Sequence, residues 1–407
     1  MVKKMVCFVF VFRLNGRFLF SRPAYYFILA CEMPTVLIFS SEFPPGPGGI
    51  AEHAYQLAVQ LSSSGFKVIV LSTQDYVDKE AVSIFNSRQN FKVLSLRHYR
   101  SSSFFQLYRI FKLFAACLTN WPELVIASGA TPGVCSVLVQ KLLGQKRLCV
   151  IHGPEYHITF SPWLTHYGLS GARLVAVSRF SREFIRKTLP GSNIQVINNA
   201  AVHIPLSDPD HAESLRSEYK GKNVLLTVGT IYYRKGQHIV IKSLPRILRF
   251  FPDTVYLIIG NGRKEQEFRE LAVSLNVEHA VKFIGQISKA DIAAYLALCD
   301  IYLLTSQVLA DGDFEGFGIS IIEAALWGKP AIGTRNNGIE DAIEDGKTGL
   351  LTNLDSPDET AEAVIKLLGD PSLRTSMGEA AKTRAEQEYN WKRIGSHYIS
   401  LINTILD

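Results

Sequence analysis

From residue 33 onward, short apolar runs alternate with longer segments in which apolar positions recur every three or four residues. The short runs are rich in β-branched residues and predict strands, and the longer segments predict amphipathic helices. This alternation is typical of a parallel sheet whose strands are joined by crossover helices. In the first half, strands are predicted at 36–40, 67–72, 124–127, 148–151 and 174–177, and helices at 51–63 and 132–143.

A second set of the same kind begins near Asn223. The stretch before it is polar, and its prolines Pro205 and Pro209 predict a linker. A separate amphipathic helix is predicted at the end of the chain, over 391–406. The other elements predicted here are strands at 224–228, 255–259, 280–284, 301–304 and 330–332, and helices at 237–250, 264–275, 290–298, 319–326 and 357–368.

Two sets of alternating elements predict an α/β fold with two Rossmann-like domains that face each other across a cleft. A length of 407 residues agrees with this, because it exceeds what one hydrophobic core usually organises. Ligands of such sheets bind beyond the carboxyl ends of the strands. The predicted parts are an extension (1–32), an N-terminal acceptor domain (33–203), a linker (204–222), a C-terminal donor domain (223–388) and a last helix that packs back on the first domain (389–407).

The first 32 residues do not follow this pattern. Apolar runs occur there, but Arg13 and Arg17 interrupt them, and no run reaches the ~18–20 residues that a membrane-spanning helix needs. Two interpretations stay open: an upstream extension from a mis-called start, because Met33 directly precedes the first predicted core strand, or a weak membrane segment.

The net charge changes little in this picture. It is +6 for the whole chain, and residues 1–32, with five basic residues and one acid, account for +4 of it. The remaining +2 does not predict nucleic-acid binding. The six cysteines have no CxxC spacing, so they predict buried thiols of a reducing compartment rather than a zinc site or disulfides.

Candidate chemistry begins with the segment from Glu315 to Glu323, which follows the strand at 301–304. Gly316 and Gly318 lack side chains where a ligand could approach the backbone, and a helix begins near Ile319. The first amides of a helix and its positive dipole end suit a diphosphate. Carboxylates there suit sugar or ribose hydroxyls. The alternative is that Glu315 caps the helix and Glu323 is solvated.

Basic residues follow another strand. Arg234 and Lys235 come after the strand at 224–228 and just before a helix, where adjacent cations can clamp phosphate oxygens. An exposed basic turn is the alternative. Asp311 and Asp313 form an Asp-Gly-Asp that could hold a metal ion, although the nearby cations can supply the same charge.

Two features of the first half also lie where strands end. Gly48 and Gly49 form a glycine-rich loop that opens the helix at 51–63 and can hold an anion on backbone amides. The loop matches neither GxGxxG nor GxxxxGK[ST]. His152 follows the strand at 148–151, which directs it towards the crevice, so it is a candidate for ligand contact or proton handling, or alternatively a structural histidine.

Taken in order, these segments resemble the retaining glycosyltransferases of family 4, which have the GT-B fold. The resemblance covers residues 33–405. Its most specific element is the pair Glu315 and Glu323 within Glu-Gly-Phe-Gly-Ile-Ser-Ile-Ile-Glu, followed by Ala-Ala-Leu-Trp-Gly-Lys-Pro. Supporting matches are Gly48-Gly49, Ala176-Val-Ser178, Val196-Ile-Asn-Asn199, Lys235-Gly236, Gly260-Asn-Gly262 and Gly346-Lys-Thr-Gly-Leu350.

The resemblance implies a hexosyl transfer from a nucleotide-diphosphate sugar, GDP-mannose or a UDP-hexose, to a glycan or lipid-linked acceptor in cell-surface polysaccharide or glycolipid synthesis. No cofactor and no metal are implied. The implied catalytic residues are His152, beside the donor sugar, Lys235, at the diphosphate, and Glu315, at the sugar hydroxyls. Arg234, next to Lys235, is added to them as a candidate from its position in the chain. The implied donor-binding residues are Gly48, Gly49, Thr230, Gly262, Ile287, Gly316, Phe317, Gly318, Ile319 and, at the ribose, Glu323.

One position departs from the family pattern. The family usually has a basic residue after the glycine that matches Gly229, and this chain has Thr230. Arg234 is the candidate for the missing charge. The missing cation at Thr230 keeps open a non-catalytic protein that binds a sugar nucleotide. A sugar-nucleotide epimerase stays open as well, because it can share the same fold.

Within the segment 97–120, residues 101–120 are apolar almost all round. Such a helix is usually buried in a core. The other interpretation is docking on an anionic membrane surface, because Arg97, His98 and Arg100 precede the apolar face. We expect a cytoplasmic protein, held peripherally on the inner face of the membrane if the second interpretation holds.

Overall fold

The computed structural model describes residues 33–46, 48–74, 78–96, 102–206 and 208–407. Before residue 33 it describes only the backbone of four short strands, where β1 (Val6–Phe8) pairs with β4 (Ala24–Tyr26) and β2 (Val11–Leu14) with β3 (Arg17–Phe20). Apart from the backbone of these strands, both interpretations of residues 1–32 fall outside the described residues.

The N-terminal domain is built on a seven-stranded sheet in the order β11-β10-β9-β8-β5-β6-β7, and all its neighbouring strands are parallel. Its first strand, β5, pairs with both β6 and β8, so the chain reverses its direction of travel across the sheet between β5 and β8. The strands are β5 (Thr35–Ser40), β6 (Lys67–Thr73), β7 (Lys92–Leu96), β8 (Leu124–Ser128), β9 (Lys146–Ile151), β10 (Arg173–Ala176) and β11 (Ile194–Val196).

Helices cover both faces of this sheet because successive side chains of a buried strand point to opposite faces. Val36 and Ile38 of β5 pack in the core that holds the apolar residues of α1. Leu37 and Phe39 pack on the other face, with α3 and α4. The helices are α1 (Gly49–Ser63), α2 (Lys79–Ser87), α3 (Ser102–Asn120), α4 (Ala130–Leu143), α5 (Glu155–Thr159), α6 (Pro162–Leu169) and α7 (Arg179–Arg186).

The C-terminal domain repeats this plan with a parallel six-stranded sheet in the order β14-β13-β12-β15-β16-β17. The reversal lies between β12 and β15. Its strands are β12 (Asn223–Val228), β13 (Thr254–Ile259), β14 (Val281–Gly285), β15 (Ile301–Leu304), β16 (Ala331–Thr334) and β17 (Gly349–Thr352), and its helices are η1 (Tyr233–Lys235), α9 (Gln237–Phe250), α10 (Glu265–Ser274), η2 (Glu278–Ala280), α11 (Lys289–Leu298), α12 (Ile319–Leu326), η3 (Gly338–Asp341), α13 (Pro357–Gly369) and α14 (Pro371–Glu388).

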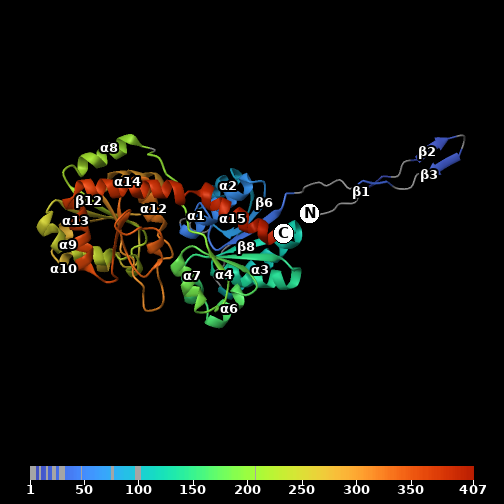
Figure 1. The fold of residues 1–407 in the computed structure, drawn as a ribbon, viewed down its shortest axis with the longest axis horizontal. Coiled ribbons are helices and arrows are strands. Elements are labelled where there is room, and N and C mark those ends of the chain that lie inside the picture. Colours follow the sequence, from blue (N-terminus) through green and yellow to red (C-terminus); the bar gives the residue numbers. More distant parts are fainter. Residues whose placement is uncertain are drawn as a thin grey trace.

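The two domains lie side by side, and the last helix, α15 (Trp391–Leu406), crosses back over the N-terminal domain (Figure 1). There Gly395 approaches Gln60 of α1, and the Lys146 ammonium donates to the carbonyl of Ile405 at 2.5 Å. A second tie joins α7 to η3: Arg179 donates from its backbone N–H and from Nε to the Asp341 carboxylate, at 2.7 and 2.6 Å.

The structure confirms the predicted α/β architecture of two Rossmann-like domains. The limits of α9, α12, α15 and β15 agree with the predicted ones. The predicted linker 204–222 is not irregular throughout, because it contains α8 (Pro209–Glu218), which packs against α11. The periodicity of α8 is weak, since only Ala212 and Leu215 are buried.

Candidate functional site

The crevice between the domains is bordered by loops from both points where the strand order reverses. In the N-terminal domain the loop after β5 contains Gly48, whose φ of +139° favours glycine. Next to it, a Cβ on Gly49 would lie 3.5 Å from Cδ1 of Ile319, at the start of α12. The glycine-rich loop of one domain therefore lies against the beginning of a helix of the other, at the place where such folds bind ligands.

The loop between β15 and α12 forms the opposite wall. A Cβ on Gly316 would stand 1.7 Å from the carbonyl oxygen of His152, so only glycine allows this approach between the domains. Gly318 has a φ of +85° and precedes the first turn of α12, where Ile319 begins the helix. Phe317 is buried, with its ring 5.5 Å from that of Tyr389, so its backbone rather than its side chain faces the crevice.

An ion cluster lies beside this helix start. The carboxylate of Glu315 accepts hydrogen bonds from Arg234 Nη1 at 2.5 Å and from Lys235 Nζ at 2.6 Å. Arg234 also pairs with Asp313 at 3.2 Å. These four side chains are between 13% and 23% exposed. Two cations and two carboxylates thus share one largely buried site.

Burial and charge act against each other in this cluster. Burial by itself would raise the pKa of Glu315, but Lys235 and Arg234 outweigh it and hold that pKa at about 2. Burial lowers the pKa of Lys235 and raises that of Asp313. Glu315 is therefore a carboxylate at any physiological pH, held in place by charge-assisted hydrogen bonds.

The backbone around the cluster is locked by close contacts. Gly236, which follows η1, has a φ of +76°, and a Cβ there would lie 1.8 Å from the carbonyl oxygen of Thr305. A Cβ on Gly262 would lie 2.0 Å from the carbonyl oxygen of Ile231. Both glycines therefore let the loops after β12, β13 and β15 pack together, which fixes the positions of Arg234 and Lys235.

Glu323 lies one turn into α12, close to a second set of charges. Burial raises its pKa, and Lys289 opposes that effect. Lys289, at the start of α11, pairs across the domains with Glu52 of α1 at 2.5 Å. Ile287, in the loop just before α11, is half-buried. Glu323 and Ile287 therefore belong to one edge of the crevice.

His152 follows β9 and is packed in a polar network of the N-terminal domain. Its Nε2 lies 2.9 Å from Oγ of Ser128, and its ring centroid lies 4.8 Å from that of His53. His53 Nε2 in turn lies 3.1 Å from the hydroxyl of Tyr398 on α15. Burial lowers the pKa of His152 to about 3, so the imidazole is neutral near pH 7.

This lowered pKa predicts a loss of stability in mild acid. A group whose folded pKa is below its ordinary value of 6.5 stabilises the fold above pH 6.5, and that contribution falls as the pH drops from 6.5 towards 3. Urea unfolding over this pH range should show a smaller pH slope for His152→Asn than for the wild type. Equal slopes would contradict the prediction. An exposed histidine, His166, provides the control: His166→Asn should keep the wild-type slope.

Sequence reasoning missed several residues of the site. Ser128 ends β8, and the strand-end rule that pointed to His152 could have found it. The sequence indicates Asp313 only as a candidate metal ligand, whereas in the structure its carboxylate pairs with Arg234. Within the described residues, no group of three or more His, Cys, Asp or Glu side chains is arranged to hold a metal ion.

Thr230 and Arg234 have different surroundings. Thr230 is exposed, and its carbonyl accepts a hydrogen bond from the side chain of Gln237 at 3.0 Å. Arg234, in contrast, reaches Glu315 from the same loop. The cation next to Lys235 is therefore Arg234, four positions after the residue where the family pattern expects one.

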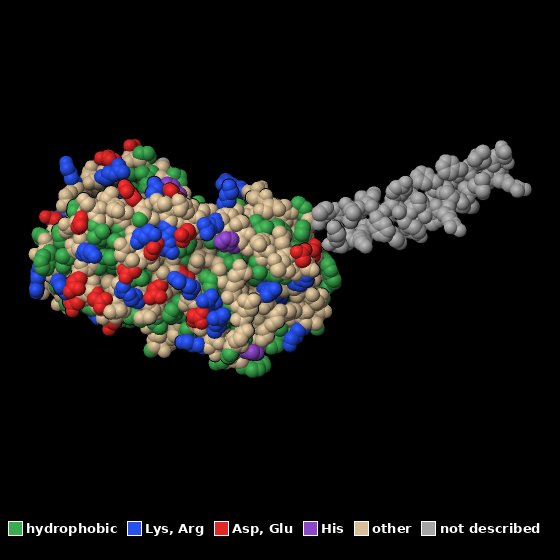
Figure 2. Space-filling view, in the orientation of Figure 1, with side chains coloured by type: hydrophobic (Ala, Val, Ile, Leu, Met, Phe, Trp, Pro, Cys, Tyr) green, Lys and Arg blue, Asp and Glu red, His purple; other side chains and the backbone are tan. Residues whose placement is uncertain are grey.

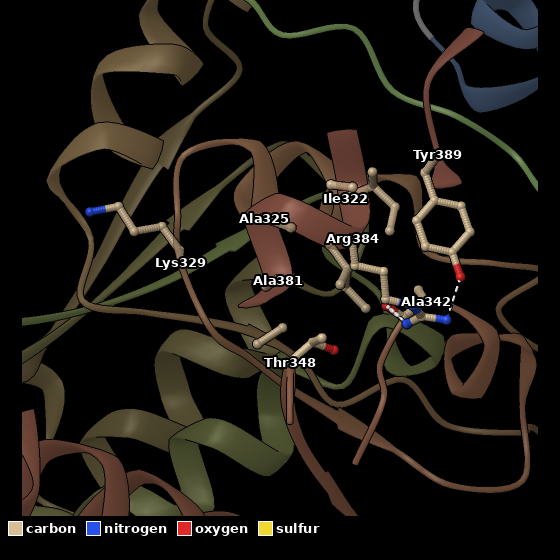
Figure 3. A pocket seen from close by; sticks show the side chains of 11 residues that line it. Ile322, Ala325, Lys329, Ala342, Thr348, Ala381, Arg384 and Tyr389 are labelled. Carbon is tan, nitrogen blue, oxygen red and sulfur yellow. Dashed lines mark hydrogen bonds between the residues drawn. The ribbon is translucent and has the colours of Figure 1, made fainter. Parts of the chain in front are cut away.

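Behind α12, a cavity of about 10 Å³ lies between that helix and α14 (Figure 3). It has room for about one water molecule. Arg384 of α14 donates to the Tyr389 hydroxyl at 2.6 Å and to the carbonyl of Ala342 at 3.2 Å. This contact ties η3 and α14 together and supports the back of the helix that faces the crevice.

Two family models match the chain, one in each domain. Residues 47–201 match the model described as Glycosyltransferase Family 4, and residues 212–384 match the model described as Glycosyl transferases group 1. Together they include most of the loops that border the crevice.

The sequence relatives include two bacterial mannosyltransferases. A GDP-mannose-dependent monoacylated alpha-(1-6)-phosphatidylinositol monomannoside mannosyltransferase of Corynebacterium glutamicum is 34% identical over 172 residues, which cover 42% of this chain and 44% of the relative. A phosphatidyl-myo-inositol mannosyltransferase of Mycobacterium leprae is 28% identical over 375 residues, covering 88% of this chain and 94% of the relative. The chain thus spans about half the length of the first relative and nearly all of the second.

A solved structure has the same fold. HepE of Anabaena, in complex with UDP and glucose, has a TM-score of 0.75 and 21% identity, and the match covers 91% of this chain and 100% of that chain. At this identity the likeness supports the fold alone.

Proposed function

This chain belongs to the family 4 glycosyltransferases, with their two-domain GT-B fold, and from that membership we propose that it transfers a hexosyl group from a nucleotide-diphosphate sugar, with retention of anomeric configuration. The acceptor is a glycan or a lipid-linked sugar. The observation that carries the proposal is the cluster of Arg234, Lys235 and Glu315 beside the start of α12, opposite the glycine-rich loop.

The chemistry of the leaving group explains why such a cluster is useful. When the glycosidic bond to the donor breaks, negative charge grows on the departing nucleoside diphosphate. Lys235 and Arg234 are fixed in a largely buried site, where preorganised charges stabilise that growing charge more than water does. The first amides of α12 add to this effect. Two cations and a helix start can fill the role of a divalent metal, so we propose a reaction without a metal ion.

The remaining residues bind the other parts of the donor. Glu315 accepts from sugar hydroxyls, and Glu323, which is half-buried at the edge of the crevice, accepts from the ribose hydroxyls. His152 is neutral and lies beside the sugar, where one ring nitrogen contacts Ser128. Gly49 allows the first loop to approach the diphosphate.

The names of the relatives suggest which substrates to test first. Those of Corynebacterium and Mycobacterium are named as mannosyltransferases that act on phosphatidylinositol mannosides or phosphatidyl-myo-inositol, and the HepE structure contains UDP and glucose. We therefore propose GDP-mannose or a UDP-hexose as the donor and a lipid-linked sugar as the acceptor, in glycolipid or cell-surface polysaccharide synthesis.

The test is incubation of the full chain with GDP-mannose or UDP-glucose and a lipid-linked acceptor, with and without excess chelator. Mass spectrometry should find a glycosylated acceptor and free nucleoside diphosphate in both arms, and NMR should find the anomeric configuration of the donor in the product. Isomerised nucleotide sugar without acceptor would indicate an epimerase. Binding without turnover of any donor would indicate a sensor, and loss of transfer with chelator would contradict the metal-free reaction.

A further inference from the structure

The backbone of His152 is held by two neighbours. Its N–H donates to the Glu155 carboxylate at 2.7 Å, and its carbonyl oxygen lies against Gly316, where a Cβ would come within 1.7 Å. Because the backbone is fixed in this way, the direction of the imidazole depends on contacts that the ring itself makes. The ring makes one such contact with Ser128 and another with His53, both in the N-terminal domain.

The two ring contacts of His152 restrict different movements. Oγ of Ser128 lies 2.9 Å from Nε2, which fixes the position of one ring nitrogen but still lets the imidazole tilt about it. The ring of His53 lies edge to face against that of His152, with the centroids 4.8 Å apart and the planes at 78°. Edge-to-face pairs of aromatic rings have a preferred geometry. His53 therefore opposes the tilt that Ser128 allows.

His53 is itself held by the last helix of the chain. It is fully buried on α1, and its Nε2 lies 3.1 Å from the hydroxyl of Tyr398 on α15. The ring of Trp391, also on α15, lies edge to face against His53 at 5.4 Å. The second ring nitrogen of His53, Nδ1, is buried without a hydrogen-bond partner. Such atoms are rare in folded proteins and destabilise them, so a histidine at this place calls for a reason other than stability.

Helix α15 has one face in solvent and the other against α1. Its buried residues recur every three or four positions, as expected for a helix that packs on one side. Lys392 and His397 are exposed, and Figure 2 shows Lys, Arg and His side chains over the place where Figure 1 draws α15. The buried face brings Trp391 and Tyr398 to His53, although Tyr398 lies 345 positions away from His53 in the chain.

We propose that His53 and Tyr398 position the imidazole of His152 for the donor sugar, so that α15 takes part in shaping the sugar end of the crevice. This role rests on the proposed hexosyl transfer, in which His152 lies beside the sugar. His53 acts through His152 and is therefore a positioning residue rather than a catalytic one. Its effect falls on the sugar and not on the diphosphate, since the two cations assigned to the diphosphate lie on η1 of the C-terminal domain.

The first experiment measures transfer and nucleotide binding by the full chain. Tyr398→Phe, which removes only the hydroxyl that contacts His53, should lower kcat about tenfold, and His53→Ala about 100-fold, because a small misplacement at the reacting centre has effects of this size. The dissociation constant of GDP or UDP, whichever the wild type binds, should stay at the wild-type value, because these ligands lack the sugar. A wild-type kcat for both folded variants would overturn the inference.

The matched control is a second buried tyrosine. Tyr256 is also fully buried, and its hydroxyl donates one hydrogen bond, to Thr227 at 2.8 Å, in the core of the C-terminal domain. Tyr256→Phe removes the same atom from the same kind of surroundings and should keep the wild-type kcat. An equal loss of kcat in Tyr256→Phe and Tyr398→Phe would overturn the inference, because the loss would then follow from any buried hydroxyl.

A double-mutant cycle separates positioning from a merely structural role. His152→Ala removes the ring on which His53 acts, so His53→Ala or Tyr398→Phe added to it should lower kcat no further. A structural role predicts the same fold loss of kcat with and without His152, and that result would overturn the inference. If His53→Ala fails to fold, as judged by circular dichroism, Tyr398→Phe completes the cycle, because it removes a single atom from the interior.

NMR of the full chain with isotope-labelled histidine reports on the imidazole without turnover. The ring signals of His152, assigned by their absence in His152→Ala, should shift in Tyr398→Phe and stay in place in Tyr256→Phe. Signals that stay in place in both variants would overturn the positioning role whatever the rates are. Signals that shift in a protein that transfers no sugar from GDP-mannose or UDP-glucose would keep the positioning of His152 and remove the proposed function.

Discussion

Replacing Glu315 by glutamine should lower the rate of hexosyl transfer by about 100- to 1,000-fold. Glutamine keeps the shape of the side chain but removes its negative charge. In the wild type the charged carboxylate accepts hydrogen bonds from Arg234 and Lys235 at 2.5 and 2.6 Å. The pKa of Glu315 is about 2, so the wild-type side chain is fully ionised in any ordinary assay. The variant therefore removes a charge that is present throughout the reaction, and it leaves one neutral amide oxygen to accept from the sugar hydroxyls in place of two carboxylate oxygens.

The same change should also lower stability. Breaking a buried ion pair by neutralising one partner costs about 3 kcal/mol or more, because the other partner stays buried without its counterion. Here two cations lose a shared partner, and only Asp313 remains near Arg234. Thermal unfolding of Glu315→Gln measures this loss, and steady-state kinetics below the unfolding temperature measures the rate.

A matched carboxylate elsewhere serves as the control. Glu213 on α8 is exposed and pairs with Arg216, and Glu213→Gln should keep the wild-type rate and unfolding temperature. Glu315→Asp retains the charge and should recover stability more than activity, because the shorter side chain cannot reach both the cations and the sugar. A folded Glu315→Gln with the wild-type rate would contradict the role assigned to this residue.

Replacing Lys235 by methionine should reduce kcat by about 100- to 1,000-fold while KM changes less. The charge on the departing diphosphate is larger in the transition state than in the bound donor, so a cation aimed at it acts mainly on kcat. Methionine keeps most of the stem, which packs along Gly229. Glu315 still pairs with Arg234, so this variant should be more stable than Glu315→Gln.

The control is also a lysine-to-methionine substitution, placed at the opposite end of β12. Lys222 precedes that strand and pairs with Asp253 on the surface, so Lys222→Met should leave both kinetic constants unchanged. A rise in KM alone for Lys235→Met would show that the lysine binds the donor without stabilising the leaving group. That result would contradict the proposed mechanism while leaving the donor site in place.

The outcome of the sequence predictions depended on how regular each pattern was. The helices at 237–250, 319–326 and 391–406 have the predicted limits because their apolar periodicity is strong and a glycine or asparagine precedes each. α8 falls within the predicted linker, and the sequence pattern predicts no helix where α14 lies, because both helices are rich in charged and polar residues and bury few apolar side chains. A helix of that kind depends on contacts with its neighbours, which no local pattern contains.

For the candidate site, local sequence pointed to the residues that follow strands. Glu315, Lys235 and His152 were all singled out in this way, because strand ends in a parallel sheet open onto the crevice. The pairings were not predictable. Arg234 and Glu315 are 81 positions apart in the chain, and so the bond between them depends on where β12 and β15 lie in the sheet. Their assigned roles in catalysis stay predictions.

The sequence by itself determined the two-domain α/β architecture, the loops that carry the chemistry and the family resemblance, because hydrophobic periodicity and short motifs are local properties. Only the tertiary structure decided that Gly316 approaches His152, that Arg179 binds Asp341 across the domains, and that Ser128 and His53 surround His152. It also decided that one side of α3 packs on the sheet while Leu107 and Phe111 on the other side reach solvent. The physical reason is that these contacts join residues far apart in sequence, so their geometry exists only once both sheets and the helices on them have assembled.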